Sequence, residues 1–580
     1  MKYSLSPLVP GSGRRNKNEF IVCDIETQNW TKFLVIGVYD GSSVHNFRSL
    51  SKFLDHVFDH HDGLDCFAHF GGRFDFLFII QEILKTELYE IENMVPRGSG
   101  LLYFDGIRRA DGAKITFRDS SALLPFSLKR LTHSFKVDSL KQEWDHSKTN
   151  GVTPELLKYL EYDLKGLYEV IEKFYSWSII NNSGRAYTIA SQALKVFRTY
   201  LKEEIPCLSP KLNENLRKFY FGGRVEIFNP MHRGPSPLYS YDVNSLYPTV
   251  MKENPFPGGF RHIAYQYEKR SLGFYEAIAT TPKNLHIPVL GISHEGKYIF
   301  PLGTFKGYWT SAEIEYAISL GYKFKIEKGY IFKNAGYIFK DFVDDLYAIR
   351  AKAEKDSVDS TIAKLLLNSC YGKFGQNPEK ENLVFDDGSE GLKPLREIKV
   401  GKNIYRLATK QVTLESFTHV GIAAFVTSYG RIKLHRLMME NPDAMFYTDT
   451  DSLFTTHKYP TGSKLGDLKL ESTVKSACFL LPKTYIAGEK IAMKGFDQKK
   501  IKHFTMDDFT ACLEGDLKAL RIIQEPKFAT FKTAIRSGEI VSMTKESPRQ
   551  IRSRYDKRQI IKLDKFRYRT CPITINQKGV

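Results

Sequence analysis

The feature that most constrains the fold is a pair of acids, Asp449 and Asp451, set among strand-forming residues in the segment Tyr447–Ser452. A third acid, Asp242, stands much earlier, where a strand-like run changes to a helical one. A polar hairpin turn would explain the pair alone, but it would not require the third acid. We therefore predict a hairpin at 445–455 beside the strand of Asp242. Two metal ions there would activate a primer hydroxyl and neutralise a triphosphate.

A second set of acids lies near the N-terminus. Asp24 and Glu26 are two residues apart on an expected strand, so their side chains share one face. Neighbouring carboxylates repel each other unless a cation lies between them, and Mg²⁺ is a hard ion that prefers oxygen ligands. An ordinary acidic patch on a sheet is the alternative. We predict two Mg²⁺ ions in each acid set, with Mn²⁺ as the alternative ion.

Two further acids join this N-terminal set. Asp75 begins an apolar helix, where it would serve equally well as a helix cap. Asp163 lies one helical turn after Tyr159 on the same helix face. Four acids can hold two ions roughly 3.5–4 Å apart, the arrangement that cleaves phosphodiesters. We expect Tyr159 to orient the attacking water.

A long helical region at 340–376 carries three polar residues on one face. Lys364, Asn368 and Tyr371 share that face, and leucines cover the rest. A lysine there can bind triphosphate oxygens, and a tyrosine can stack on a base pair. A solvated helix face would show the same pattern. We interpret the three residues as a nucleotide-binding face.

The chain of 580 residues has a formal net charge of +18 and a pI near 9.2. Such an excess of Lys and Arg is typical of proteins that bind an anionic polymer, although charge for solubility is an alternative. Thr427 and Arg431, four residues apart, predict a phosphate contact, and Lys483 predicts another. The length favours two or more domains.

The segment from Arg549 to Arg569 is basic and interleaved with aromatic residues, namely Tyr555, Phe566 and Tyr568. Basic residues beside aromatic rings are typical of surfaces that grip single-stranded nucleic acid. A solvated basic face is the alternative. We predict a nucleic-acid surface here.

Seven cysteines are scattered through the chain, and none forms a CxxC pair. This pattern argues against a disulfide framework and a zinc site, and it favours a reducing, intracellular compartment. No apolar run approaches the roughly 20 residues that cross a membrane. We expect a cytoplasmic protein of a host cell, with an organelle as the alternative, and no membrane partner.

The order of the motifs resembles that of family B DNA polymerases. Three segments resemble the exonuclease motifs of that family: Asp24-x-Glu26, Phe74-Asp75 and Tyr159-x-x-x-Asp163. Three others resemble its polymerase motifs: Asp242-x-x-Ser245-Leu246-Tyr247-Pro248, Lys364-x-x-x-Asn368-Ser369-x-Tyr371-Gly372 and Tyr447-x-Asp449-Thr450-Asp451-Ser452. The resemblance covers nearly the whole chain. It implies that these acids and Val243 hold the metal ions, and that Tyr247 excludes a ribose 2′-hydroxyl.

Further motifs resemble the protein-primed branch of the family, which occurs in small linear phages and linear plasmids. They are Tyr220-x-Gly222-Gly223, Thr427-x-x-Gly430-Arg431 and Lys483-x-Tyr485. The resemblance implies DNA contacts for Tyr220, Gly222, Gly223, Thr427, Arg431, Lys483 and Tyr485, and a nucleotide contact for Lys483. It also makes Lys141 a catalytic residue and Ser120 a contact for single-stranded DNA.

Two residues depart from the family pattern. Phe70 follows His69 where the family usually has Asn, and an extra glycine comes after it. Ser121 follows Ser120 where the family usually has Leu. The Phe70 departure puts the grip of the exonuclease site on its substrate in question.

The resemblance implies a multidomain α/β and α+β fold. An RNase H-like 3′→5′ exonuclease domain is expected at 1–186, joined by a linker near Asn181–Gly184 to a right-hand polymerase domain at 187–580. The expected subdomains are a palm at about 187–252 and 419–520, a priming-protein insertion at about 253–340, fingers at about 341–376, a processivity insertion at about 377–418 and a thumb at about 521–580.

The predicted function is a DNA-directed DNA polymerase with a proofreading exonuclease, which replicates a linear genome by protein priming with strand displacement. Its expected partners are template and primer DNA, deoxynucleoside triphosphates and a priming protein, and the chain is expected to be a monomer. Two rivals remain open: a nucleic-acid-primed family B polymerase, and a non-catalytic replication factor whose acids are structural.

Overall fold

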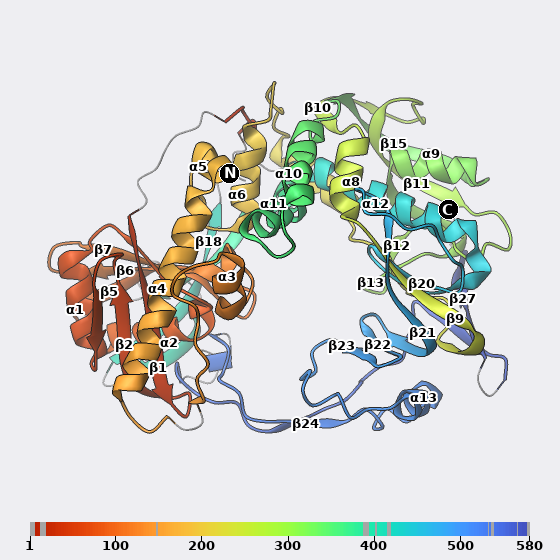
Figure 1. The fold of residues 1–580 in the computed structure, drawn as a ribbon. Coiled ribbons are helices and arrows are strands. Elements are labelled where there is room, and N and C mark those ends of the chain that lie inside the picture. The colour runs from red at the N-terminus through yellow and green to blue at the C-terminus, as the bar shows by residue number, and fades with distance from the viewer. Residues whose placement is uncertain are drawn as a thin grey trace.

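The computed structural model describes residues 6–11, 19–146, 149–386, 392, 394–400, 403–413, 419–531, 533–534, 539–564 and 567–576. Helices and mixed sheets form three main bodies (Figure 1). The N-terminal body lies on the left of the view, the helices α10 and α11 lie at the top, and the sheets of the C-terminal half lie on the right.

A ten-stranded sheet organises the N-terminal body, in the order β17-β18-β16-β5-β6-β7-β4-β1-β2-β3. Its first seven strands along the chain are β1 (Phe20–Gln28), β2 (Lys32–Tyr39), β3 (Val44–Phe47), β4 (Asp65–Ala68), β5 (Tyr89–Arg97), β6 (Gly100–Arg108) and β7 (Lys114–Asp119). β1 and β2 pair antiparallel, whereas β1, β4 and β7 run parallel. The parallel strands therefore bring their carboxyl ends to one edge of the sheet.

Helices cover both faces of this sheet. Its helices are α1 (Leu50–His60), α2 (Asp75–Lys85), α3 (Leu128–Ser134) and α4 (Pro154–Ser176). The apolar residues of α1 and α2 share one core with Ile21 and Ile25, whereas those of α4 share another with Phe20 and Val22. Because alternate residues of a strand point to opposite faces, the side of α4 is also the side of Asp24 and Glu26.

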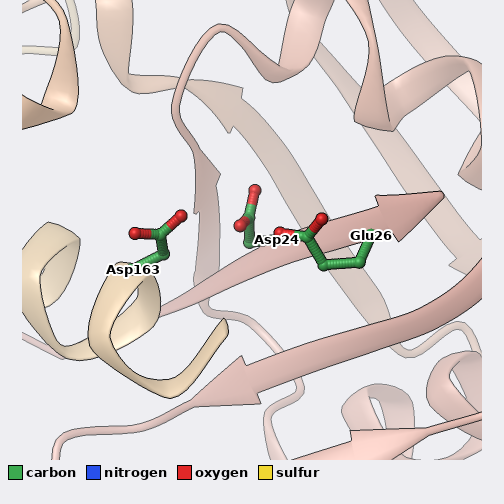
Figure 2. Close-up of side chains that lie close together, drawn as sticks. All are labelled: Asp24, Glu26 and Asp163. Atoms are coloured by element: carbon green, nitrogen blue, oxygen red, sulfur yellow. The ribbon is translucent and has the colours of Figure 1, made fainter. Parts of the chain in front are cut away.

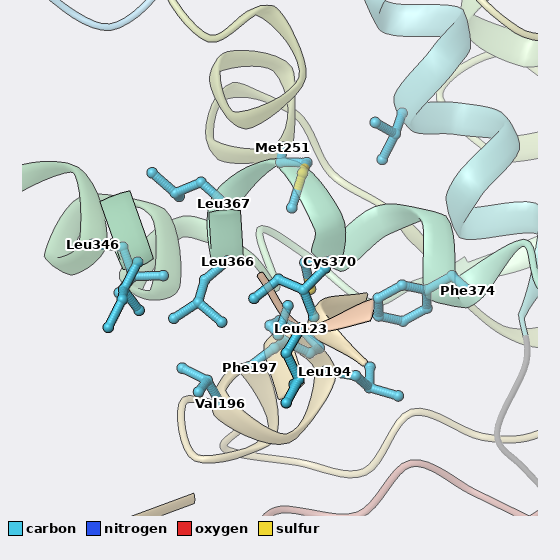
Figure 3. Close-up of a cluster of buried hydrophobic side chains, with 14 of the residues drawn as sticks. Leu123, Leu194, Val196, Phe197, Met251, Leu346, Leu366, Leu367, Cys370 and Phe374 are labelled. Carbon is cyan, nitrogen blue, oxygen red and sulfur yellow. The ribbon is translucent and has the colours of Figure 1, made fainter. Parts of the chain in front are cut away.

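The linker predicted at Asn181–Gly184 lies at the end of α5 (Ser178–Ser183), and Gly184 has a positive φ of 82°. The following helix is α6 (Ile189–Arg198). Thr188 caps its N-terminus, and the Thr188 side chain accepts a hydrogen bond from the amide of Ser191. Phe197 of α6 packs against Phe374 and Phe339. Figure 3 shows this core, where α6 and Leu123 of the N-terminal body meet the helices of the other half.

A seven-stranded sheet carries the second acid set, in the order β23-β22-β21-β9-β20-β19-β8. Its strands are β8 (Val225–Ile227), β9 (Met231–Val243), β19 (Met445–Asp449), β20 (Ser452–Thr455), β21 (Leu468–Leu481), β22 (Thr484–Ala487) and β23 (Lys490–Met493). The hairpin predicted at 445–455 is confirmed as β19–β20, which lies directly beside β9. β9 ends at Val243, directly after Asp242.

Two helical regions lie in this half: the one predicted at 340–376 is α10 (Lys340–Lys352) and α11 (Val358–Phe374), and the other is α12 (Val420–Glu440). The first region is two helices, because Ser357 begins a new one by accepting a hydrogen bond from the amide of Ser360. The other helices of this half are α7 (Pro210–Leu216), α8 (Leu246–Glu253), α9 (Ser311–Ser319) and α13 (Met506–Glu514).

The interval 253–340, where the priming-protein insertion was predicted, forms a sheet of its own. The strands β10 (Pro257–Ala264), β11 (Leu272–Thr280), β14 (Leu302–Thr310) and β15 (Lys323–Asn334) are joined by β28 (Thr574–Asn576) in the order β10-β15-β11-β14-β28. A small hairpin, β12 (Ile292–His294) and β13 (Lys297–Ile299), lies between β11 and β14 in the chain.

The interval 377–418, where the processivity insertion was predicted, extends the N-terminal sheet. Its strands are β16 (Glu379–Asp386), β17 (Pro394–Val400) and β18 (Asn403–Thr413), and β16 pairs with β5 at Leu383 and Met94. Residues 387–391, 393, 401–402 and 414–418 of this interval lie outside the described residues.

The basic segment 549–569 differs from its prediction as a nucleic-acid surface. Tyr555 and Tyr568 are both 6% exposed, because each packs into a core; Phe566 lies outside the described residues. The remaining strands of this region are β24 (Ile522–Gln524), β25 (Ser547–Arg549), β26 (Arg558–Lys562) and β27 (Tyr568–Pro572). Within the described part of the chain, no helix is both long and apolar enough to cross a membrane.

Candidate active sites

Three acids of the N-terminal set converge on one point. Asp24 and Glu26 lie on β1 and Asp163 lies on α4, and each offers a carboxylate oxygen within 4.8 Å of the others (Figure 2). The side chains of Glu26 and Asp163 are buried, and that of Asp24 is half-buried. Three carboxylates at this spacing, shielded from water, form a donor set suited to a divalent cation.

Asp75 adjoins this cluster through the backbone of β1. It is 3% exposed, and its Oδ1 accepts a hydrogen bond from the amide of Ile25 at 3.0 Å. Asp75 begins α2, as predicted, but the helix cap is Phe74. The structure thus brings all four predicted acids to one edge of the sheet.

Lys141 reaches the same cluster from the loop before α4. Its ammonium donates a hydrogen bond to the Tyr159 hydroxyl at 2.5 Å and forms an ion pair with Asp163. Tyr159 is 5% exposed and packs on Trp144. The lysine and tyrosine predicted to be catalytic are therefore side by side at the acids.

The environment favours the protonated acids when no cation is bound. Burial raises the pKa of Glu26 to about 8, and the charge of Asp163 adds to this shift. Burial likewise raises the pKa of Asp75 to about 7 and the pKa of Asp163, which the ammonium of Lys141 opposes. Burial and the neighbouring acids also raise the pKa of Asp24. A bound cation would remove this penalty.

The two departures from the family pattern lie at the edge of this site. Phe70 adopts a left-handed backbone conformation, with φ 59°. Ser120 is 1% exposed and bonds the His69 imidazole at 2.9 Å, whereas the Ser121 amide donates to Asp119. Ser120 therefore lies beneath the surface in this structure, and its predicted DNA contact stays a prediction.

The second acid set lies on adjacent strands of the seven-stranded sheet. Asp242 on β9 pairs with Ser452, and Asp449 on β19 pairs with the same residue. Asp451 lies in the turn between β19 and β20, where its carbonyl accepts a hydrogen bond from the amide of Val243 at 2.8 Å. The three acids are neighbours, although the only described group with three ligand atoms within 4.8 Å of one another is the N-terminal cluster.

The turn between the two acids is held by unusual backbone geometry. Thr450 has φ 65°, and its amide donates to the carbonyl of Arg224 at 2.8 Å. A Cβ on Gly223 would come within 2.8 Å of the Thr450 side chain, so a larger residue at this position would force Thr450 to shift. Burial raises the pKa of Asp242 to about 6, and Asp451 adds to this shift.

The predicted nucleotide-binding face points away from the core. On α11, Lys364 and Asn368 are exposed and Tyr371 is half-buried, as the helical spacing predicted. The Tyr371 ring lies 4.6 Å from the ring of Tyr247. Tyr247 lies on α8, the helix that follows the strand of Asp242. Tyr220 packs against Gly375 at the end of α11.

Lys483 lies at the second acid set. Its ammonium is 3.4 Å from the Asp449 carboxylate, and its side chain is 54% exposed. Tyr485, two residues later, is 9% exposed and packs among Tyr447, Phe454 and Phe479. The structure therefore makes Tyr485 a core residue and does not place it on a surface where DNA could contact it.

Thr427 and Arg431 are buried on α12, contrary to a direct phosphate contact. The Thr427 hydroxyl bonds carbonyls of its own helix. The Arg431 guanidinium, 2% exposed, donates to Glu313 Oε1 at 2.7 Å and to the carbonyls of Phe221 and Gly222, both at 2.9 Å. Arg431 thus holds the exposed Gly222 in place from beneath.

Glu313 is a functional neighbour that the sequence did not single out. It stands in a capping box with Thr310 at the start of α9, so its sequence context indicates only a helix cap. In the structure it is 2% exposed and also accepts from Ser428 at 2.8 Å. Its partner, Arg431, is on a distant helix, and no local pattern marks such a pair.

The structure contains two acid sets on separate sheets, and each set has a lysine beside it. This arrangement agrees with the exonuclease and polymerase motifs predicted from the sequence. A family model described as DNA polymerase type B, organellar and viral, matches residues 150–456. This chain belongs to that family. The predicted family B membership is therefore confirmed.

Similar proteins occur in fungi and phages. The chain is 29% identical to a probable DNA polymerase of Neurospora intermedia, over 78% of this chain and 55% of the relative. It is 27% identical to the DNA polymerase of Bacillus phage phi29, over 68% of this chain and 70% of the phage protein. It spans only 41% and 38% of probable DNA polymerases from Ascobolus immersus and Podospora anserina.

A solved structure shares the fold. The phi29 DNA polymerase complexed with primer-template DNA and incoming nucleotide aligns with this chain at a TM-score of 0.74 and 21% sequence identity. The alignment covers 93% of this chain and 100% of the phi29 chain. This likeness confirms the predicted fold class, an exonuclease-type domain joined to a right-hand polymerase domain.

Proposed function

We propose that this chain is a DNA-directed DNA polymerase with a 3′→5′ proofreading exonuclease. The observation that carries the proposal is the presence of two separate acid sets, one at the edge of the ten-stranded sheet and one on the β19–β20 hairpin. Template and primer DNA and deoxynucleoside triphosphates are the substrates that such a pair of sites fits.

The donor set at each site fits Mg²⁺. Asp24, Glu26, Asp75 and Asp163 would hold the ions of the exonuclease site, and Asp242, Asp449, Asp451 and the carbonyl of Val243 those of the polymerase site. Bound Mg²⁺ would lower the pKa of the attacking group and stabilise charge on the leaving oxygen. Mn²⁺ is the alternative ion, with the same oxygen ligands.

Residues around the exonuclease acids orient the reacting water. The Tyr159 hydroxyl, fixed by Lys141 at 2.5 Å, would accept or donate a hydrogen bond to that water. Lys141 would also balance the negative charge of Asp163 before substrate arrives. Ser120 would act on a single strand by fixing His69.

Residues around the polymerase acids select and orient the nucleotide. Lys364 would bind triphosphate oxygens from α11, and Lys483 would approach them from beside Asp449. Tyr247, held against Tyr371 at 4.6 Å, would leave no space for a 2′-hydroxyl. Asn368 would contribute a hydrogen bond on the same face.

Primer extension tests the function directly. With Mg²⁺, a primed template and four deoxynucleotides, the chain should extend the primer, and Asp451→Asn should abolish extension while single-strand degradation continues. Asp24→Ala with Glu26→Ala should do the reverse. A chain that binds DNA but does neither reaction would be the non-catalytic replication factor.

We also propose protein priming and the domain boundaries given by the motifs. The support is that 253–340 and 377–418 each form their own strands, and that relatives occur in phages, among them PRD1 at 28% identity. A linear end offers no upstream 3′-hydroxyl, so a side-chain hydroxyl of a partner protein would take its place. We propose a monomeric, cytoplasmic enzyme.

Priming has its own assay. The chain, a candidate partner, Mg²⁺ and one labelled deoxynucleotide should give label on the partner that survives denaturation. If no encoded partner accepts a nucleotide while ordinary primers are extended, the enzyme is a nucleic-acid-primed polymerase.

A further inference from the structure

Glu226, on β8, is buried between two arginines. Its side chain is 0% exposed, and those of Arg224 and Arg558 are 1% and 0% exposed. Arg224 Nε donates to Glu226 Oε2 at 2.7 Å, whereas Arg558 Nη1 stands 3.8 Å from Glu226 Oε1. We call these three side chains the Glu226 cluster. It places one negative charge between two positive charges inside the protein.

The Glu226 cluster joins three parts of the chain that are far apart in sequence. Arg558 Nε donates to Thr570 Oγ1 at 2.7 Å, within the β26–β27 hairpin. Arg558 Nη2 donates to the carbonyl of His286 at 2.8 Å, and Arg224 Nη1 donates to that of Pro288 at 2.7 Å. The C-terminal hairpin and the loop before β12 are therefore both fixed to β8.

The backbone of β8 and of Arg224, which directly precedes it, contacts the segment of the polymerase acids. The carbonyl of Arg224 accepts the amide of Thr450 at 2.8 Å, and Val225 pairs with Asp449. Thr450, with φ 65°, lies between Asp449 and Asp451. A movement of β8 would thus change the separation of the two acids.

We propose that Glu226, Arg224 and Arg558 are positioning residues for the polymerase metal site, and that they couple the C-terminal hairpin to it. The proposal rests on the proposed polymerase function. Removing the carboxylate of the Glu226 cluster would leave its two buried cations without their counter-charge, which is strongly destabilising, so we expect the backbone of β8 to shift in response. The backbone that shifts is the segment that fixes the turn at Thr450. Outer residues that orient metal ligands usually change metal affinity by about 10- to 100-fold.

The test measures metal binding directly. In a chain that also carries Asp24→Ala and Glu26→Ala, Mn²⁺ binding is followed by electron paramagnetic resonance with and without Glu226→Gln. We expect Glu226→Gln to weaken Mn²⁺ binding about tenfold or more. In the otherwise unchanged chain, the Mg²⁺ concentration for half-maximal primer extension should rise by a similar factor, and exonuclease activity should stay the same.

Two further variants keep the test decisive if Glu226→Gln does not fold. Arg558→Lys keeps the charge but loses the contacts to Thr570 and His286, so it should weaken Mn²⁺ binding to a smaller extent. Adding Arg558→Met to Glu226→Gln removes one of the two cations and should restore part of the affinity.

A matched control removes an acid from an ion pair elsewhere. Asp65 pairs with Arg118 in the N-terminal sheet, so Asp65→Asn should lower the melting temperature without changing Mn²⁺ affinity at the polymerase acids. Unchanged Mn²⁺ affinity in folded Glu226→Gln, even with a lower melting temperature, would overturn the positioning role. Failure of the unmodified chain to extend any primer would instead overturn the proposed function.

Discussion

The exonuclease acids make the stability of the metal-free protein depend on pH. The pKa of Glu26 rises from 4.5 to about 8 on folding, so the folded state holds a proton that the unfolded state has lost between these pH values. The stabilising contribution is fully present below pH 4.5 and disappears as pH rises through about 8. We expect the melting temperature without metal to fall over this range.

Mg²⁺ should reverse this trend, because it binds the ionised acids and therefore stabilises the folded state more at pH 8 than at pH 6. Calorimetry with and without Mg²⁺ measures both effects. Asp24→Asn with Glu26→Gln should flatten the pH dependence. A metal-free melting temperature that rises between pH 5 and 8 would contradict the prediction.

Replacing Phe70, at the edge of the exonuclease site, should change both stability and nuclease activity. Its φ of 59° is unfavourable for Phe but tolerated by Asn. Phe70→Asn should therefore stabilise the protein by about 1 kcal/mol and speed the degradation of single strands, because the amide can hydrogen-bond the primer end. Denaturation and a nuclease assay measure the two effects.

Phe70→Leu serves as the control, since it removes the ring without adding an amide. A slower Phe70→Asn enzyme would indicate that the Phe70 ring stacks on a base.

At the level of elements, one buried ion pair joins α12 to α9. Arg431 and Glu313 have side chains only 2% and 3% exposed. Breaking such a pair from one side leaves an unpaired buried charge, which costs about 3–5 kcal/mol. Arg431→Met and Glu313→Leu should each lower the free energy of unfolding by this amount.

The double variant Arg431→Met with Glu313→Leu should lose much less than the sum of the two single losses, apart from about 1 kcal/mol for the missing helix cap. Denaturant titration measures all three. Strictly additive losses would show that the pair is not coupled.

The elements differ in how far the sequence predicts them. The β19–β20 hairpin follows from local pattern, because strand-forming residues on both sides of a short polar segment are typical of two strands joined by a turn. The pairing of β16 with β5 does not, since nothing near Leu383 marks Met94 as its neighbour.

The roles of the buried acids Glu313 and Glu226 could not be predicted either, because each has an arginine partner far along the chain. The prediction for Tyr555 is wrong because an aromatic residue among basic residues suits a core as well as a surface.

For the whole molecule, the three strands of 377–418 should matter for strand displacement more than for chemistry. It belongs to the sheet of the N-terminal body, and the Tyr405 hydroxyl donates to the carbonyl of Leu84, at the end of α2, at 2.7 Å. Deleting 377–418 should reduce DNA binding and displacement synthesis more than single-nucleotide addition on a short primer. Gel-shift and displacement assays compare these effects.

Tyr405→Phe is a milder version of the same change, because it removes the hydrogen bond from Tyr405 to Leu84, worth about 1 kcal/mol. It should cause a smaller loss in the same direction. Equal losses of addition and displacement after the deletion would contradict this role.

The parallel pairing of β28 with β14 also has a consequence for biosynthesis. A ribosome makes residues 574–576 after every other strand of that sheet, so the edge of β14 stays unpaired while the rest of the nascent chain emerges. The N-terminal sheet must likewise wait for β16–β18 before it is complete. Each of these two sheets is completed only by strands that are synthesised later. Until those strands have been made, each sheet exposes an unpaired strand edge to other nascent chains.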